Sequence, residues 1–299
     1  MGQDDFHQYY QDLYGDRWSG LRAALVSPLK STVAVLNPFC TDQTWRAQVG
    51  GVNSPDWDMI LLPTVLSETP FPAPSTFGME LYPYYLLDHA SAIAALLLHL
   101  TSETLYADFC AAPGGKSLIA LFKQHGQVKA LLNEPSQDRF RRLKSNLAQY
   151  LPSNIMKELT LTSFDGRRFG LHRPESFDTI LLDAPCSSER HVLLDQKELA
   201  HWKPKRSKQL SELQFSLLCS AFASLKLGGL LLYSTCALAP QENEIQIERL
   251  IKKRPDQVEV ASHPLLDKYF EKRSHGYLAL PDLQRMGPLY CCLLKKIEK

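Results

Sequence analysis

Short apolar runs alternate with longer amphipathic stretches from about residue 84 to the end of this 299-residue chain. The apolar runs are Leu105–Phe109, Val128–Asn133, Leu159–Thr162, Phe177–Leu182, Gly229–Ser234 and Leu289–Leu294. The stretches with helical length and period are Tyr84–Leu100, Lys116–Gln124, Asp138–Tyr150 and Leu210–Leu225. Strands that alternate with helices in this way predict βαβ units and an α/β fold with a mostly parallel, doubly wound sheet. Ligands of such sheets bind at the C-terminal ends of the strands.

The first 83 residues follow another pattern. Apolar residues recur at helical spacing near the N-terminus, with a break at Gly15–Asp16 and an end at Pro28, which predicts a small helical cap. Residues 37–83 contain seven prolines, and this density disfavours long regular elements. We therefore expect an irregular connector with one short strand near Met59–Leu62. The sequence thus predicts a cap and connector at 1–83, followed by an α/β domain at 84–299.

Composition and charge exclude several classes of protein. A hydrophobic share of 44% and a charged share of 22% are typical of a folded globular chain and exclude intrinsic disorder. No apolar run approaches the roughly 20 residues that cross a bilayer, so we expect no membrane association. The net charge of +1 gives no overall attraction to nucleic acid, which leaves that role to local clusters. The first five residues show neither a signal peptide nor a transit peptide pattern, which predicts a cytoplasmic protein.

A loop of small residues follows the first apolar run, at residues 108–117, and leads into a predicted helix. Its two glycines let the backbone approach a ligand closely, and the free N–H groups of the helix start favour a carboxylate or a phosphate. Glu134 stands about 20 residues further on, where nucleotide-binding sheets place an acid that holds a ribose. Asp165 and Asp183 follow later strands. The residues predicted to bind the cofactor are Cys110, Ala111, Ala112, Pro113, Gly114, Gly115, Lys116, Glu134, Arg139, Asp165, Gly166 and Asp183.

Two ligands fit this loop: a nucleoside triphosphate, or S-adenosylmethionine with its carboxylate at the helix start and its ribose on Glu134. A phosphate-binding P-loop has its first glycine where this chain has Cys110, which disfavours the triphosphate and an ATPase. A glycine-rich turn that binds nothing is the third alternative, and the acids after the following strands argue against it. S-adenosylmethionine is the predicted cofactor.

Two cysteines follow two neighbouring predicted strands, Cys186 after Asp183 and Cys236 after Tyr233–Thr235. Both thiols are expected to face the ligand crevice. A thiolate that adds to C6 of cytosine makes C5 nucleophilic toward a sulfonium methyl group, and loss of the C5 proton then expels the sulfur. We expect one thiol to attack, the other to assist release, and Asp183 to engage the N3/N4 edge of the base.

The other cysteines have simpler interpretations. Cys219, Cys291 and Cys292 fall in helix or strand patterns and are expected to be small buried residues. Cys110 is expected to shape its loop. Seven cysteines without regular spacing predict free thiols, and the lack of Cys-x-x-Cys or paired Cys/His spacing argues against a zinc site.

The chain resembles the Sun/RsmB-type RNA cytosine-5 methyltransferases at these motifs, over about residues 84–294. The matching segments are the Asp-x-Cys-Ala-Ala-Pro-Gly-Gly-Lys loop at 108–116, Asn133-Glu134, the Asp-Gly-Arg at 165–167, the Asp-Ala-Pro-Cys at 183–186, the Tyr-Ser-Thr-Cys at 233–236 and the Glu-Asn-Glu at 242–244. The resemblance implies a Rossmann-like methyltransferase sheet, S-adenosylmethionine as cofactor and 5-methylcytosine as product. It also implies that Cys236 is the nucleophile and that Cys186 aids product release.

Within that family the chain is most similar to the short, mitochondrial-type branch, as seen at residues 14–18, 189–191 and 286–290. That branch acts on ribosomal or transfer RNA without added RNA-binding domains. Ribosomal RNA is the expected substrate and transfer RNA the alternative, and a protein partner that supplies RNA affinity is left open. Phe109, His89 and Ser188 depart from the usual residues of the family. A non-catalytic RNA-binding assembly factor is the remaining alternative, and the intact catalytic residues argue against it.

Three basic clusters are candidates for RNA contact: Arg139, Arg141, Arg142 and Lys144; Arg167, Arg168 and Arg173; and Lys203, Lys205, Arg206 and Lys208. The third follows Cys186 closely enough to steer a phosphate backbone toward the thiols. For the first cluster, a solvated helix face is an equal alternative. Trp202 is expected either to stack on an unpaired base or to pack in the interior. The target cytosine must be unpaired or extruded for its C5–C6 edge to be reached.

Overall fold

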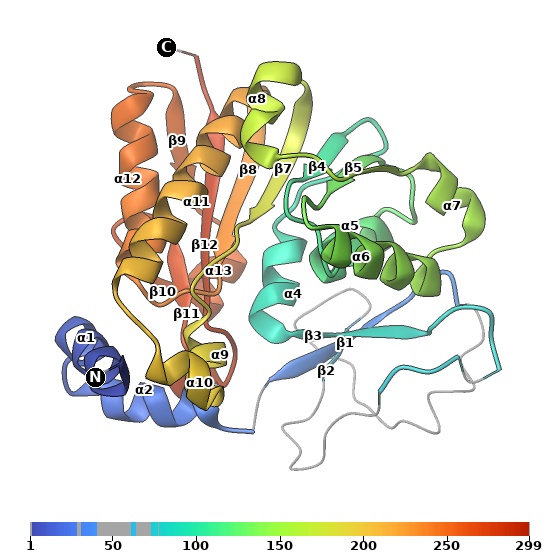
Figure 1. Cartoon of the computed structure of the whole chain (residues 1–299). Helices are drawn as coiled ribbons and strands as arrows, with labels where there is room; N and C mark the ends of the chain where they lie inside the picture. Colours follow the sequence, from blue (N-terminus) through green and yellow to red (C-terminus); the bar gives the residue numbers. More distant parts are fainter. Residues whose placement is uncertain (1, 29–30, 41–60, 64–72, 77, 299) are drawn as a thin grey trace.

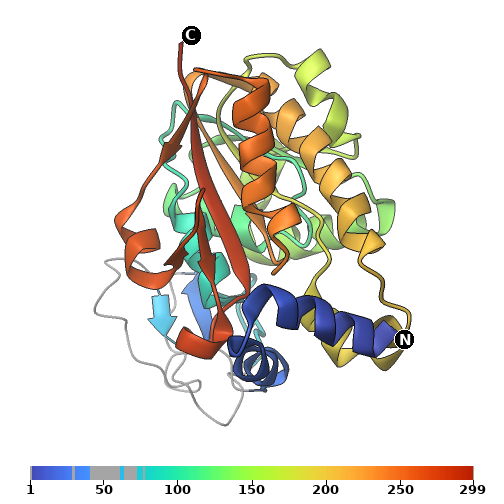
Figure 2. The ribbon, with the colours of Figure 1, turned by 90° about the vertical axis from the view of Figure 1, so that its left-hand side faces the viewer.

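The structure is a computed structural model, and it describes residues 2–28, 31–40, 61–63, 73–76 and 78–298 (Figure 1). The chain begins with two helices, α1 (Gly2–Tyr14) and α2 (Arg17–Val26), separated at Gly15–Asp16 as the sequence predicts. Both helices end before Pro28. Helix α1 packs against α10 (Gln196–Ala200), and α2 packs against α9 (Glu189–Leu194) and α14 (Pro281–Gln284) (Figure 2).

A large sheet forms the centre of the molecule. Its strands are β4 (Leu105–Asp108), β5 (Lys129–Asn133), β6 (Thr160–Thr162), β7 (Phe177–Asp183), β8 (Leu225–Thr235), β9 (Val258–Ala261), β10 (Glu271–Lys272), β11 (Tyr277–Ala279) and β12 (Leu289–Lys296). Strands β6-β5-β4-β7-β8 lie side by side and parallel, which is the order of a doubly wound Rossmann-like sheet. The strand order reverses between β4 and β7, so a ligand crevice is expected at their C-terminal ends. The predicted fold class is confirmed.

The far edge of this sheet is antiparallel. Strand β12 pairs antiparallel with β8, and β11 and β9 pair antiparallel with β12. The predicted apolar run at the C-terminus therefore forms a strand, but one that runs against the parallel core.

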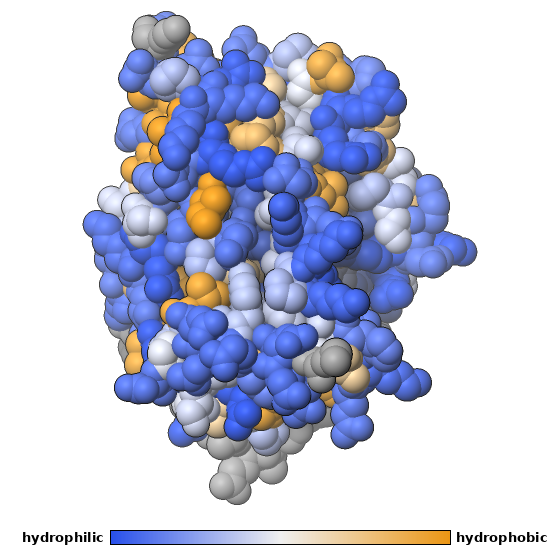
Figure 3. Space-filling view, turned by 60° about the vertical axis from the view of Figure 1, so that its left-hand side comes forward, coloured by the Kyte–Doolittle hydropathy of each residue, from blue (hydrophilic) through white to orange (hydrophobic). Residues whose placement is uncertain are grey.

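Helices cover both faces of the sheet (Figure 1). They are α4 (His89–Leu96), α5 (Gly115–Lys123), α6 (Gln137–Tyr150), α7 (Ser153–Glu158), α8 (Phe169–His172), α9 (Glu189–Leu194), α10 (Gln196–Ala200), α11 (Lys205–Ser224), α12 (Glu244–Lys253), α13 (Pro264–Tyr269) and α14 (Pro281–Gln284), with 3₁₀ turns η1 (Gly166–Arg168) and η2 (Pro240–Glu242). Alternate strand residues face opposite sides: Leu132 belongs to an apolar cluster that includes residues of α4, α5 and α6, whereas Leu131 belongs to a cluster that includes residues of α1 and α11. The sheet therefore has one apolar core on each face, between the strands and the covering helices. The outer surface toward α11 and α12 is mainly hydrophilic (Figure 3).

A second, three-stranded sheet lies beside α4. It consists of β2 (Leu61–Pro63), β1 (Thr32–Leu36) and β3 (Tyr84–Asp88), all antiparallel. Strand β2 overlaps the predicted short strand, whose residues 59 and 60 lie outside the described residues. The boundary between residues 83 and 84 stays a prediction, although hydrogen bonds between β1 and β3 link the two sides of it.

The prediction of one helix over Tyr84–Leu100 is wrong in its first five and last four residues, since the helix α4 ends at Leu96. Residues 84–88 form β3, because hydrogen bonds to β1 satisfy their backbone N–H and C=O groups. Their two tyrosines also favour a strand. Asp88 then ends the strand and caps α4, since its side chain accepts a hydrogen bond from the Ala90 N–H at 2.9 Å. Strand β1 was likewise absent from the predicted pattern.

Candidate active site

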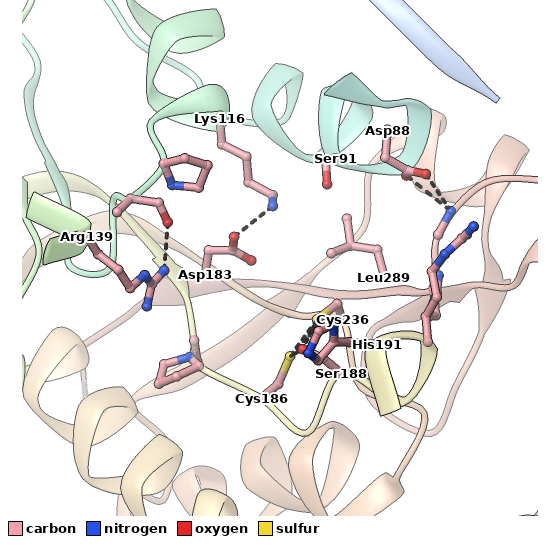
Figure 4. Close-up of a pocket in the computed structure, with 17 residues that line it drawn as sticks. Asp88, Ser91, Lys116, Arg139, Asp183, Cys186, Ser188, His191, Cys236 and Leu289 are labelled. Carbon is pink, nitrogen blue, oxygen red and sulfur yellow. Dashed lines mark hydrogen bonds and ion pairs between the residues drawn. The ribbon is translucent and has the colours of Figure 1, made fainter. Parts of the chain in front are cut away.

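A cavity of about 540 Å³ opens at the C-terminal ends of β4, β7 and β8 (Figure 4). Its wall on the side of α5 and α6 comes from Ala112, Pro113, Lys116 and Arg139. The opposite wall holds Asp183, Cys186, Ser188 and Cys236, and the outer rim holds Asp88, Ser91, Arg190 and His191. The cavity thus unites the predicted cofactor loop with the two predicted cysteines.

The two cysteines lie in contact inside this cavity. Strands β7 and β8 are neighbours with Asp183 opposite Ser234, so the loops that follow them leave the sheet together. The sulfur atoms of Cys186 and Cys236 are 2.7 Å apart, and the Ser188 hydroxyl lies 3.1 Å from the Cys236 sulfur. The structure therefore places both thiols at the crevice, as the sequence predicts.

Hydrogen bonding makes the two thiols unequal. The pKa of Cys236 is lowered because the Cys186 thiol, and next the Ser188 hydroxyl, donates to its sulfur, and this outweighs burial. The pKa of Cys186 is raised well above its usual range, because its proton is held by Cys236 and because it is buried. Cys236 is therefore the thiol of the pair that ionises first, and a thiolate is the nucleophilic form.

Asp183 lies between the cysteines and the cofactor loop. Its Oδ2 accepts a hydrogen bond from Lys116 Nζ at 2.8 Å, and its Oδ1 accepts one from the Ser234 hydroxyl, also at 2.8 Å. Although burial opposes ionisation, the charge of Asp183 raises the pKa of Lys116 and keeps it protonated. A fixed ion pair thus faces the cavity, with a donor and an acceptor for a polar ligand.

The cofactor loop is shaped by its glycines and by a buried acid. Gly114 has φ of +111°, and a Cβ on Gly115 would come within 2.7 Å of the Tyr85 ring. Asp108 is 2% exposed and lies beneath the loop, where it accepts hydrogen bonds from the Cys110 N–H at 3.1 Å and the Ser117 hydroxyl at 2.6 Å. Burial raises the pKa of Asp108 to about 7.

Replacing Asp108 by asparagine is expected to flatten the pH dependence of stability. In the unfolded chain this carboxyl loses its proton near pH 4, whereas the folded protein holds the proton up to about pH 7. The free energy of unfolding therefore falls as pH rises through this window, by up to about 1.4 kcal/mol per pH unit from this group. The asparagine side chain would keep the bond from Cys110 and donate to Ser117 without titrating. Urea unfolding of both proteins at pH 5 and pH 7 tests this. An equal change in the free energy of unfolding between the two pH values in the wild type and the variant would contradict it.

The remaining predicted cofactor residues are not among those that line this cavity: Cys110, Ala111, Gly114, Gly115, Glu134, Asp165 and Gly166. Glu134 is 1% exposed, and its Oε1 accepts a hydrogen bond from the Ser136 N–H at 3.0 Å. Its Oε2 accepts no hydrogen bond and lies 3.5 Å from Arg139 Nη2. Asp165 pairs with Arg167 beyond the loop. Asn133, fully buried, donates to the carbonyls of Phe109 and Phe164 and so ties the segment before Asp165 to the cofactor loop.

Two parts of the site could not be settled from the sequence. Trp202 is 1% exposed and its ring centroid lies 5.1 Å from that of Phe6, so of the two alternatives for Trp202 the structure supports packing in the interior. Ser188 and Ser234 contact Cys236 and Asp183, roles that the sequence did not indicate. Both stand within the strand-end motifs, which was the available signal.

Comparison with known proteins decides the family. A profile of the 16S rRNA methyltransferase RsmB/F family matches residues 95–295. The chain belongs to the RsmB/F methyltransferase family. A mouse protein named mitochondrial tRNA (cytosine(34)-C(5))-methyltransferase is 31% identical over 98% of this chain and 89% of its own. Mouse 5-cytosine rRNA methyltransferase NSUN4 is 29% identical over 99% of this chain and 89% of its own.

Solved structures agree on the fold of this RsmB/F family member. The structure of NSun6 from Pyrococcus horikoshii with SFG aligns with a TM-score of 0.79 at 17% identity, over 99% of this chain and 98% of that one. At this identity the likeness establishes the fold alone. The predicted family and the predicted Rossmann-like methyltransferase fold are both confirmed.

S-adenosylmethionine is the cofactor of this family member, and the residues present fit it. The buried Glu134 Oε2 without a hydrogen bond suits a ribose hydroxyl, and the start of α5 suits a carboxylate. Ala112 and Pro113 offer a small wall against which the cofactor would lie.

Replacing Glu134 by glutamine is expected to raise the Kd of S-adenosylmethionine about ten-fold or more, since hydrogen bonds to a charged group are worth roughly 1.5–3 kcal/mol. The glutamine carbonyl would still accept the bond from Ser136, so folding should be retained. Isothermal titration calorimetry with the cofactor alone measures the change, and an unaltered Kd would remove Glu134 from the cofactor site.

Proposed function

We propose that this protein transfers a methyl group from S-adenosylmethionine to C5 of a cytosine in RNA, through a covalent bond between Cys236 and C6. The observation that carries the proposal is the pair of sulfur atoms 2.7 Å apart in the same cavity as the Lys116–Asp183 ion pair. Two cysteines with only a packing role would not be expected to line a cavity, to differ in thiol pKa, or to lie beside an ion-paired carboxylate.

Each residue of the cavity has a distinct role in this mechanism. The Cys236 thiolate adds to C6, and Asp183, held by Lys116 and Ser234, engages the N3/N4 edge as the ring electrons move toward C5. The cofactor, when bound, supplies an electrophilic methyl group. After C5 has formed its new bond, C5 gives up its proton to solvent, and the electron pair of the broken C–H bond restores the C5–C6 double bond while the bond between C6 and Cys236 breaks. Cys236 leaves as a thiolate, and the Cys186 thiol stabilises it by donating a hydrogen bond without losing its proton, as in the free protein.

The basic clusters support an RNA substrate. Arg142, Lys144, Arg168, Arg173, Lys203, Lys205 and Lys208 are exposed. Arg141, Arg167 and Arg206 instead pair with Asp138, Asp165 and Glu198, which reduces their availability for phosphate. Exposed cations suit a phosphate backbone, with affinity that falls as salt rises.

Ribosomal RNA is the substrate we propose, with transfer RNA as the alternative, because relatives named for each cover nearly the whole chain. Methyl transfer from tritiated S-adenosylmethionine to separated ribosomal and transfer RNA fractions distinguishes them. Label in 5-methylcytosine of ribosomal RNA is the expected result. Label in transfer RNA alone would select the alternative, and cofactor binding without transfer to either RNA would favour a non-catalytic assembly factor. A dependence of transfer on added extract would indicate a protein partner.

A cytoplasmic location stays part of the proposal. Among the described residues, no helix has the length and apolar character needed to cross a membrane. One similar protein carries a mitochondrial name, so microscopy of the tagged protein in its own cells is the test.

A further inference from the structure

Helix α1 contacts the two loops that carry the cysteines, although it lies at the start of the chain. The Tyr10 hydroxyl donates to Glu189 Oε1 at 2.6 Å, between residues 179 positions apart. The Tyr14 hydroxyl donates to the Leu238 carbonyl at 2.9 Å. Tyr10 is 0% exposed and packs against Phe6 and Trp18, so its ring is held in place from several sides.

Glu189 joins one cysteine loop to the other. It is the first residue of α9, three positions after Cys186, and it is 0% exposed. Its Oε1 also accepts from the Ser187 hydroxyl at 2.5 Å, and its Oε2 accepts from the N–H of Leu238 at 2.9 Å. One carboxylate thus binds the residue after Cys186 and the residue two positions after Cys236.

A second buried carboxyl supports the same turn. Glu242 Oε2 accepts hydrogen bonds from the Ser187 N–H at 3.0 Å and from Gln214 Nε2 at 2.8 Å. Gln214 Nε2 also lies 2.8 Å from the Pro185 carbonyl. Burial, and next the charge of Glu189, raises the pKa of Glu242. The turn that carries Cys186 is therefore held from two sides by buried groups, and the loop of Cys236 is held by one of them.

We infer that Glu189, anchored by Tyr10 of the N-terminal helix, is a positioning residue that sets the distance between the sulfur atoms of Cys186 and Cys236. Its catalytic consequence rests on the proposed function, whereas the distance is a property of the folded chain. Three donors converge on a buried carboxylate. Glutamine can keep an acceptor for the N–H of Leu238, but it loses the charge and presents an amide donor to the Tyr10 and Ser187 hydroxyls, which would have to accept instead of donate. Small displacements of reacting groups cost large factors in rate.

Tyr10→Phe and Glu189→Gln test this inference, with Tyr277→Phe as the matched control. Tyr277 is 4% exposed and donates to Asp267 at 2.7 Å, so the control loses an equivalent bond away from the cysteines. The first readout is the rate at which diamide, which takes up both thiol hydrogens, forms the Cys186–Cys236 disulfide in the protein alone, followed by mass spectrometry. Losing a hydrogen bond to a charged group should slow this about ten-fold in the two variants and leave the control unchanged.

The second readout is methyl transfer. The kcat should fall about ten-fold in Tyr10→Phe while KM for S-adenosylmethionine stays constant, because the hydrogen bonds of Tyr10 and Glu189 do not reach the cofactor loop. A disulfide rate unchanged in Tyr10→Phe would overturn the inference, and so would an equal loss in Tyr277→Phe. If Glu189→Gln does not fold, Tyr10→Phe decides alone. If wild-type protein transfers no methyl group but its disulfide rate depends on Tyr10, the positioning role stands and the proposed function fails.

Discussion

Replacing Cys236 by alanine is expected to abolish methyl transfer, with kcat reduced about 10³-fold or more because the covalent step is lost. The other groups of the cavity remain: Lys116 still pairs with Asp183, and the cofactor wall is untouched. The Kd of S-adenosylmethionine should therefore stay within a factor of about two, and stability should change by less than about 1 kcal/mol, as for a substitution at a cavity wall. The kcat is measured from the tritium that is transferred from S-adenosylmethionine to RNA and retained with the RNA on a filter.

The matched control is Cys219→Ala. Cys219 is half-buried on α11 and does not line the cavity, so this variant should keep wild-type kcat. Activity of Cys236→Ala close to that of the control would reject Cys236 as nucleophile. A complete loss in Cys186→Ala without any adduct would assign that role to Cys186 instead, against the direction in which the two thiol pKa values are shifted.

The parallel half of the sheet was predictable from sequence because each βαβ unit is a local pattern. Apolar runs such as Phe177–Leu182 are bounded by turn residues and match β7 within one residue. Strand β3 was missed because Tyr84–Asp88 becomes a strand only through pairing with β1, a contact that periodicity does not record. Strands β9 and β10 contain the charged residues Glu259, Glu271 and Lys272, so they lack the continuous apolar run that reveals the parallel strands.

The candidate site was predictable as far as it depends on strand ends. Cys186, Cys236, Asp183 and Lys116 all follow from the rule that ligands lie at the C-terminal edge of a parallel sheet. The residues that hold the two cysteine loops in place could not be predicted in this way. Tyr10 contacts Glu189 only because α1 packs against the folded domain. The sequence did not predict this contact, because no local pattern around a tyrosine in an N-terminal helix indicates a hydrogen-bond partner 179 residues away.

Replacing Cys186 by alanine is expected to slow release of the covalent intermediate, so that protein bound to RNA accumulates while turnover falls. The Cys236 sulfur would still add to C6, but more slowly, because it loses the hydrogen bond from Cys186 that lowers its pKa. It keeps the contact with the Ser188 hydroxyl at 3.1 Å. Its departure would lack the hydrogen-bond donor that lies 2.7 Å away. Losing a donor to a developing thiolate is worth roughly 1.5–3 kcal/mol, or about 10–100-fold in the release step.

Denaturing gel electrophoresis of Cys186→Ala incubated with RNA and S-adenosylmethionine should therefore show a slow band that ribonuclease removes. The double variant Cys186→Ala with Cys236→Ala should show none, because the bond to C6 cannot form. Multiple turnovers at the wild-type rate by Cys186→Ala, with no slow band, would exclude a role for Cys186 in release. In that case the contact between the two sulfur atoms would act only before the attack, by stabilising the Cys236 thiolate.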